Sequence, residues 1–311
     1  MKSAQRELAL LGAILVLGLL PLFGVPGFYT VANLRNLALD NVPVLVTAIG
    51  MTAVIIVAEI DISVGSVFVV CGALAGLTAQ AGLPMPLVVA TTLGAGALFG
   101  AVNGLLVAWA RVPSIIATLG TMAILRNGII HATGGAWIQN LPPGFQWFGL
   151  GQNLAQPVYL MLALALVVAG VWTLRQTSLG RSLYAVGCDR VAARRVGLNP
   201  PAIILAAFVL LGTLTAMAAL FNFTRYPTIE TNAGVGFELQ VIAAVVVGGT
   251  AVTGGRGNLL GTLLGVVLLG MIGTVLTFLH INPAWAQAIE GLIILAAVVS
   301  DTAFGRDHAH D

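Results

Sequence analysis

The chain has 311 residues, of which 59% are hydrophobic and only 8% are charged, and its mean hydropathy is +1.02. Because soluble domains carry roughly 25% charged residues, this composition excludes a soluble globule and predicts an all-α polytopic membrane protein. The net charge of +2 does not support a nucleic-acid-binding surface, so no nucleic acid partner is expected.

The first apolar run spans residues 8–23 and follows a short basic flank that carries Lys2 and Arg6. Such a pattern also fits a secretory signal peptide, but the chain continues PLFGVPGF without a small-x-small cleavage site. We therefore favour an uncleaved first membrane helix. Residues 28–41 are more polar and predict an interfacial helix or a connector.

Further apolar runs are long enough to cross a bilayer, which takes about 17–25 residues each. They are residues 42–60, 64–82, 86–108, 113–131, 157–174, 199–221, 259–279 and 284–301. A shorter, Gly-rich run at 237–252 is either a full crossing or a broken, re-entrant element. Counting it as a crossing gives about ten transmembrane helices in a single transmembrane domain, residues 1–311.

The distribution of basic residues favours ten crossings. With the N-terminus inside, only Arg35, Arg126 and Arg225 of the thirteen Lys and Arg residues lie at or near the outer side, as the positive-inside rule requires. Without a crossing at 237–252, Arg256 and the C-terminus would lie outside. We therefore expect both termini in the cytoplasm.

The longest external connection, about residues 132–156, contains no Asp, Glu, Lys or Arg but carries Trp137 and Trp147. Tryptophans at a membrane edge usually belong to the aromatic belt. A docking surface for an external partner is the alternative, and we favour the belt.

The most polar segment is a cytoplasmic loop at about residues 175–200, between the sixth and seventh crossings. It contains five of the thirteen basic residues of the chain, and Asp189 is its only acid. The arginines are Arg175, Arg181, Arg190, Arg194 and Arg195.

Two polar, Gly-bearing corners also face the cytoplasm in this arrangement. In the first corner, residues 59–66, the side chains of Asp61 and Ser63 are placed to cap the following helix. In the second corner, residues 248–258, five glycines allow a sharp turn and close helix packing. It has no Gly-Lys-Ser/Thr and is not a phosphate-binding P-loop. Each corner joins a descending helix to an ascending one, a weak indication of an internal repeat.

The sequence shows no enzyme machinery. The four histidines do not cluster with carboxylates or cysteines, and HExxH, GxSxG and CxxC are absent. Cys71 and Cys188 suggest neither a disulfide framework nor a metal site. We therefore expect no catalytic residues and no bound metal.

A passage for a neutral polar solute is the better prediction. Glu290 is the only acid inside a predicted span, whereas ion-driven carriers usually place ionisable residues at mid-membrane. Uncharged polar residues are more frequent there, although Ser and Thr also hold helices together. The candidates for the translocation path are Asn103, Thr118, Thr121 and Asn127. A self-sufficient secondary carrier or channel is the alternative function.

Four blocks of the sequence are IDISVGS at 60–66, VPSIIATLGTMAILRNG at 112–128, GRSLYAVGCDRVAARRVGLN at 180–199 and AAVVVGGTAVTGGRGNLLGTLLG at 243–265. Together these blocks resemble the permease subunits of bacterial ribose-type sugar ABC importers. The external TGGAWIQNLPP segment is closer to the rhamnose and autoinducer-2 branches than to ribose permeases.

This resemblance implies a subunit of the bacterial inner membrane that dimerises with an identical or a different permease chain. It also implies two cytoplasmic ABC ATPase subunits or one fused ATPase, which would bind ATP and Mg, and a periplasmic solute-binding protein. No cofactor is expected in this chain.

In this family the helix around Ala185–Gly197 would couple the permease to its ATPase. The candidate coupling residues are Gly180, Arg181, Gly187, Asp189, Ala192, Ala193, Arg194 and Gly197. The family's corner motifs fall on Asp61, Ser63, Gly65, Ser66, Gly248, Gly249, Gly254, Gly255, Arg256 and Gly257.

The chain departs from the family pattern at two places. Gly187-Cys188-Asp189 replaces the usual Gly-Gly-Asn, and Glu59 replaces a frequent glycine. We expect Glu59 to pair with Arg256 across the two corners.

Overall fold

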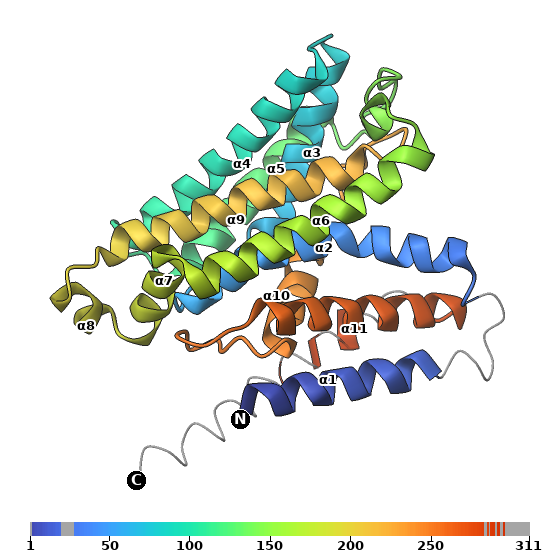
Figure 1. The fold of residues 1–311 in the computed structure, drawn as a ribbon. Helices are drawn as coiled ribbons and strands as arrows, with labels where there is room; N and C mark the ends of the chain where they lie inside the picture. The colour runs from blue at the N-terminus through green and yellow to red at the C-terminus, as the bar shows by residue number, and fades with distance from the viewer. Residues whose placement is uncertain are drawn as a thin grey trace.

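The computed structural model describes residues 2–19, 28–282, 285, 287–289, 291, 292 and 295. These residues form helices joined by turns and loops (Figure 1), and within these ranges the only β pairing is an isolated bridge between Ile138 and Ile229. The helices are α1 Lys2–Leu19, α2 Val31–Ile56, α3 Val64–Gln80, α4 Met85–Ala108, α5 Ser114–Thr133, the 3-10 helix η2 Gln146–Gly149, α6 Gln152–Gln176, α7 Ser178–Cys188, α8 Arg190–Arg195, α9 Pro200–Phe223, α10 Phe237–Val247 and α11 Leu259–Phe278.

Six of these helices, α2, α4, α5, α6, α9 and α11, are long and apolar enough to cross a membrane. Helices α1, α3 and α10 contain shorter apolar stretches. Each of them lies in a run that was predicted from the sequence to cross the membrane. Most of the predicted span 284–301, including Glu290, and the C-terminal residues lie outside the described part. The all-α prediction is confirmed for the described residues, whereas ten crossings and cytoplasmic termini stay predictions.

The polar segment 28–41 is not a separate interfacial element. It is continuous with the next apolar run in α2, a 26-residue helix that contains Pro43 and ends at Ile56. A proline inside a helix frees the carbonyl four residues earlier, here that of Leu39. The Arg225 guanidinium donates to this carbonyl at 3.1 Å and to Asp40 at 2.6 Å. A distant arginine therefore satisfies the backbone group that the proline leaves unpaired.

Helix α10 is too short to cross a bilayer as a helix. Its 11 residues span about 16 Å, against a hydrocarbon core of about 30 Å. The chain then turns at Gly248 and Gly249 and continues without helix to Asn258. Thr250 and Ala251 of this segment are buried. Irregular backbone at membrane depth is tolerated where protein covers it.

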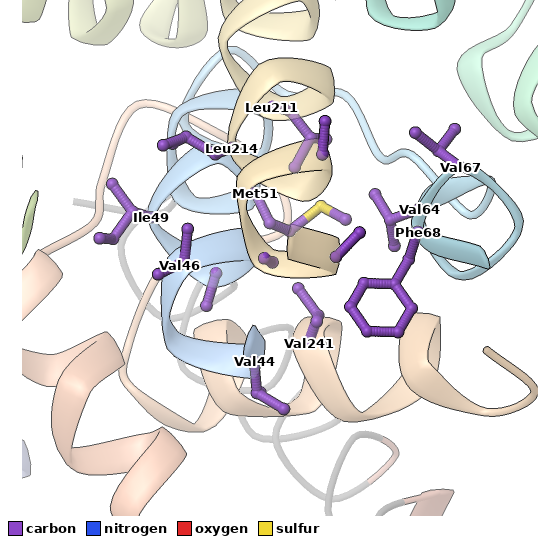
Figure 2. Packing of buried hydrophobic residues seen from close by; sticks show 14 of the residues in the cluster. Val44, Val46, Ile49, Met51, Val64, Val67, Phe68, Leu211, Leu214 and Val241 are labelled. Carbon is purple, nitrogen blue, oxygen red and sulfur yellow. The ribbon is translucent and has the colours of Figure 1, made fainter. Parts of the chain in front are cut away.

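The core lies where α2, α3, α9 and α10 meet (Figure 2). Met51 of α2, Phe68 of α3, Leu211 of α9 and Val241 of α10 are buried together there. Gly50 brings α2 and α9 into backbone contact, since a Cβ at this position would lie 2.6 Å from the Leu211 Cα. Helix α2 is thus the central element, surrounded by protein over most of its length.

Helices α4 and α9 also approach closely through glycines. A Cβ on Gly96 or Gly212 would overlap the backbone of the opposite helix, and one on Gly100 would overlap the Phe208 carbonyl. Membrane helices without a hydrophobic driving force associate through such small residues. Helix α1 lies along α11 (Figure 1), and Gly18 near its end approaches Met271 in the second half of α11. The two helices therefore run in the same direction.

Candidate site at the basic segment and the two corners

The basic segment forms two helices rather than the single helix expected around Ala185–Gly197. The break is at Asp189, whose backbone is extended (φ −160°, ψ 111°) and whose carboxylate accepts from the Val191 and Ala192 N–H groups at 2.7 and 3.1 Å. These two bonds, helped by Arg195, lower the pKa of Asp189. An aspartate at this place ends α7 and caps α8, so the segment is two helices where one was predicted.

Helix α8 ends at Arg195 with Val196 as its C-cap, and Gly197, the next residue, has a left-handed backbone (φ +85°). The Leu198 N–H bonds the Ala193 carbonyl, and the Gly197 N–H bonds the Arg194 carbonyl. This is a Schellman ending, for which glycine is favoured because it has no Cβ. The predicted residues Asp189 and Gly197 therefore delimit a six-residue helix.

Helix α7 packs tightly on its neighbours through two of the predicted glycines. A Cβ on Gly180 would overlap the end of α6 at Thr173 and Leu174. One on Gly187 would overlap the Ile56 carbonyl at the end of α2 and lie 2.7 Å from the Gly255 N. Arg181, by contrast, is exposed and donates to the Gln176 carbonyl. Both glycines thus permit close backbone contact.

Helix α7 also bonds the second corner. The Tyr184 hydroxyl donates to the Gly257 carbonyl at 2.8 Å, and burial raises the pKa of Tyr184. The Gly255 N–H donates to the Ile56 carbonyl at 2.9 Å. The end of α2, the second corner and α7 therefore form one contact region, although they are far apart in sequence.

Helix α8 bonds the first corner through Arg190. Its guanidinium contacts a Glu59 carboxylate oxygen at 2.6 Å and the Val57 carbonyl at 3.1 Å. The Glu59 side chain is only 9% exposed, whereas that of Arg190 is 43% exposed. The ion-pair partner of Glu59 is therefore Arg190, not Arg256 as expected, because the break at Asp189 directs the start of α8 against the end of α2.

Within the first corner a buried hydrogen-bond network replaces the expected caps. One Asp61 oxygen accepts from the Ser63 N–H at 2.8 Å and from the Ser63 hydroxyl at 2.6 Å. The Asn103 amide donates to the other Asp61 oxygen at 3.1 Å and to the Ser63 hydroxyl at 2.9 Å, and Thr121 donates to Asn103 at 2.6 Å. Ser63 makes no side-chain cap to α3. The capping prediction is wrong for Ser63, since its hydroxyl is used by Asp61 and Asn103.

Helix α5 holds the same corner with residues spaced one turn apart. The Ser114 hydroxyl accepts from the Ile60 N–H at 3.3 Å, and that of Thr118 accepts from the Ile62 N–H at 3.2 Å. The Ser66 hydroxyl donates to the Met122 carbonyl at 3.1 Å. The non-helical backbone of the corner is thus satisfied by side chains of α5.

Three of the four path candidates therefore lie in this network. Asn103 and Thr118 are fully buried, and Thr121 bonds Asn103. Asn127 is exposed and donates to the Ala123 carbonyl of its own helix.

The remaining motif glycines shape the corners. Gly249, Gly254 and Gly255 have positive φ angles, and Gly248 lies against the Gly261 backbone of α11. Beside Gly65, at the start of α3, sequence reasoning missed an ion pair between Arg126 and Glu238 at 3.6 Å. Gly65 leaves room for it, since a Cβ there would overlap the Glu238 carboxylate. The sequence signal for this ion pair was that Arg126 and Glu238, which have opposite charges, both lie towards the predicted outer ends of their membrane spans.

Helix α8 presents an exposed face to its surroundings. Val191 is 62% exposed and Val196 is 76% exposed. Ala192, Arg194 and Arg195 are also exposed, whereas Ala193 is buried. Exposed apolar residues flanked by arginines therefore form a contact surface on a helix that Arg190 bonds to the first corner. No group of three His, Cys, Asp or Glu side chains in the described ranges could hold a metal.

Comparison with known proteins decides the family. Residues 33–298 match the family described as the permease component of branched-chain amino acid transport systems. The chain belongs to this family. The described apolar helices agree with it, so the chain is a multi-pass membrane protein and a transport component rather than an enzyme.

Curated relatives support the same assignment. The chain is 36% identical over 297 residues to the autoinducer 2 import system permease protein LsrC of Escherichia coli O157:H7, covering 96% of this chain and 87% of the relative. LsrC of Enterobacter sp. (strain 638) is 36% identical over 296 residues, covering 92% and 84%. LsrC of Salmonella paratyphi B is 35% identical over 302 residues, covering 93% and 85%. No solved structure matches the chain. The permease resemblance noted in the sequence is thereby confirmed.

Proposed function

We propose that this permease is the translocation subunit of an ABC importer that moves a sugar-like solute into the cytoplasm. The curated relatives are named for autoinducer 2 import, and we propose a solute of this type, with ribose and rhamnose as the related alternatives. ATP with Mg is bound and hydrolysed by a partner ATPase, as two subunits or one fused chain. A periplasmic solute-binding protein delivers the solute, and a second permease chain completes the passage.

One observation carries this proposal. The exposed helix α8 is joined by Arg190 to the first corner, and the adjoining α7 is joined by Tyr184 and Gly187 to the second corner and the end of α2. A force applied to the exposed face of α8 would therefore reach α2, α3, α10 and α11 through short, direct contacts. We propose that the predicted coupling residues act in this way.

We also propose that both termini lie in the cytoplasm and that residues 1–311 form one domain with about ten crossings, with residues 132–156 outside. Two features support this arrangement. Arg111, Arg190 and Arg194 converge at one end of the molecule, as the positive-inside rule expects of the cytoplasmic end. Helix α1 runs parallel to α11, so it begins at that same end. Segment 237–258 would reach the cytoplasmic end partly as α10 and partly as covered, non-helical chain.

We propose that the solute passes along the exposed face of α5 and its counterpart in a second permease chain. Asn127 lies on this face. Asn103, Thr118 and Thr121 would then form the polar layer behind it, which fixes the position of the first corner.

The test is reconstitution of the permease in liposomes with and without its ATPase and binding protein. Uptake should require all components and ATP, and the ATPase should co-purify with the permease. Uptake by this chain alone, driven by an ion gradient, would instead show a secondary carrier and overturn the proposal.

A further inference from the structure

A cavity of about 330 Å³ lies between α8, the turn that joins α4 to α5, and the start of α9. Its polar lining consists of Arg111, Arg190, Arg194 and Glu59. Its volume falls within the range of about 300–1,000 Å³ that is usual for small-molecule sites. It is separate from the Asp61 network and from the exposed valines of α8.

The charge of this cavity is positive. Glu59 is already paired with Arg190 at 2.6 Å. Within the described ranges, Arg111 and Arg194 take part in none of the ion pairs. Two guanidinium groups therefore line the cavity without a carboxylate partner. Such a site favours an anionic ligand.

Helix dipoles add to this preference. Helix α5 begins at Ser114, directly after the lining residue Pro113, and α9 begins at the lining residue Pro200. The amino ends of helices carry partial positive charge and bind anions. The carboxyl end of α4 also reaches the cavity at Ala108, and its dipole offsets one of the two.

We propose that this cavity binds a phosphate group held between Arg111 and Arg194. The planar guanidinium fork matches phosphate oxygens and gives paired, charge-assisted hydrogen bonds. The group can come from soluble phosphate or from the headgroup of an anionic phospholipid. The second source is possible because Trp109, Ile115 and Ile116 beside the cavity are exposed and apolar, as acyl chains require.

The experiment compares the two sources on the full-length permease, alone and bound to its ATPase. Thermal unfolding is followed in nanodiscs of phosphatidylcholine during titration with inorganic phosphate, with chloride at matched ionic strength as the blank. The second arm replaces part of the phosphatidylcholine with phosphatidylglycerol. Stabilisation in the first arm identifies a soluble ligand, and stabilisation in the second arm alone identifies a lipid headgroup.

The variants decide whether the cavity is responsible. Arg111→Gln should weaken the response by roughly ten- to a hundredfold in ligand concentration, as expected for a lost hydrogen bond between charged groups, and Arg111→Lys should restore part of it. Arg195→Gln removes the same charge from α8 outside the cavity and should leave the response unchanged. Three results would each overturn the proposal: no stabilisation in either arm, equal losses for Arg111→Gln and Arg195→Gln, or a response that disappears when the ATPase is bound.

Discussion

The Glu59–Arg190 pair is the most direct link between the exposed basic helix and the membrane-embedded corners, and its strength can be measured. We consider Glu59→Gln, Arg190→Ala and the double variant as a mutant cycle. Arg190→Ala removes the partner of a carboxylate that is only 9% exposed and also frees the Val57 carbonyl. Glu59→Gln keeps the shape of the side chain and removes the charge.

The geometry sets the expected size of the coupling. Exposed ion pairs contribute about 0.2–1 kcal/mol, whereas hydrogen bonds to charged groups contribute about 1.5–3 kcal/mol. The N–O distance is 2.6 Å, and one partner is buried while the other is 43% exposed. We therefore expect a coupling free energy of about 1–2 kcal/mol, between these two cases. Arg190→Ala should be the worse single variant, because it leaves a buried charge without a partner.

The assay is denaturant-induced unfolding of the purified permease in detergent micelles for all four proteins. Arg181→Ala is the matched control, since Arg181 is an exposed arginine of the same segment, and it should change the free energy of unfolding by less than about 0.5 kcal/mol. If the effects of Glu59→Gln and Arg190→Ala add within about 0.3–0.5 kcal/mol, the pair does not link α8 to the first corner.

Three further predictions concern α7, the buried network and the cap of α8. Gly187→Ala should lower the thermal unfolding temperature and the amount of solute moved per ATP, because the added methyl group overlaps the Ile56 carbonyl. In the control Gly94→Ala the methyl group meets nothing within 4 Å, so its unfolding temperature should not change; equal unfolding temperatures for the two variants would contradict the close packing of α7 on α2. Asn103→Leu should destabilise the permease by about 2–4 kcal/mol in denaturant unfolding, since it leaves buried groups of Asp61 and Ser63 unpaired. The control Asn127→Leu, on the exposed face, should cost less than about 0.5 kcal/mol, and similar losses of unfolding free energy in both variants would show that the network contributes little. The lowered pKa of Asp189 means that its stabilisation of α8 is fully present above its unfolded pKa of about 3.9 and is lost as the pH falls through the lower folded value. The protection factors of the Val191 and Ala192 amides, which correct for the intrinsic pH dependence of hydrogen exchange, should therefore fall on acidification through this window but not in Asp189→Asn, and identical pH profiles of protection would refute the cap.

The sequence predicted the helical class and most helix positions because apolar runs of bilayer length are a strong local signal. It could not predict that α2 continues through Pro43. The Leu39 carbonyl that Pro43 leaves unpaired is satisfied by Arg225, 186 residues away in the sequence. Similarly, the glycines of the second corner predicted a turn and close packing. They did not indicate that this corner meets the end of α2, since the Gly255–Ile56 bond joins distant segments.

The sequence predicted which residues belong to the candidate site better than it predicted the contacts between them. The motif located the glycines and arginines of the basic segment, and the cap at Asp189 could have been deduced from its position before a short helical stretch. The partner of Glu59 could not, because Arg190 and Arg256 are both expected on the cytoplasmic side. The direction of α8 decides between them, and that direction follows from the packing of α7 on α2 and α6.

The central claim is that a partner ATPase drives transport through the exposed face of α8. Ala192 is exposed there, so Ala192→Glu can disturb a partner without disturbing the fold. Ala81→Glu, at an exposed alanine beyond the far end of α3, is the matched control. With both proteins unfolding at the temperature of the parent, the account predicts that Ala192→Glu loses co-purification of the ATPase together with ATP-driven uptake, while Ala81→Glu retains the ATPase. Full co-purification and undiminished uptake by Ala192→Glu would contradict the account.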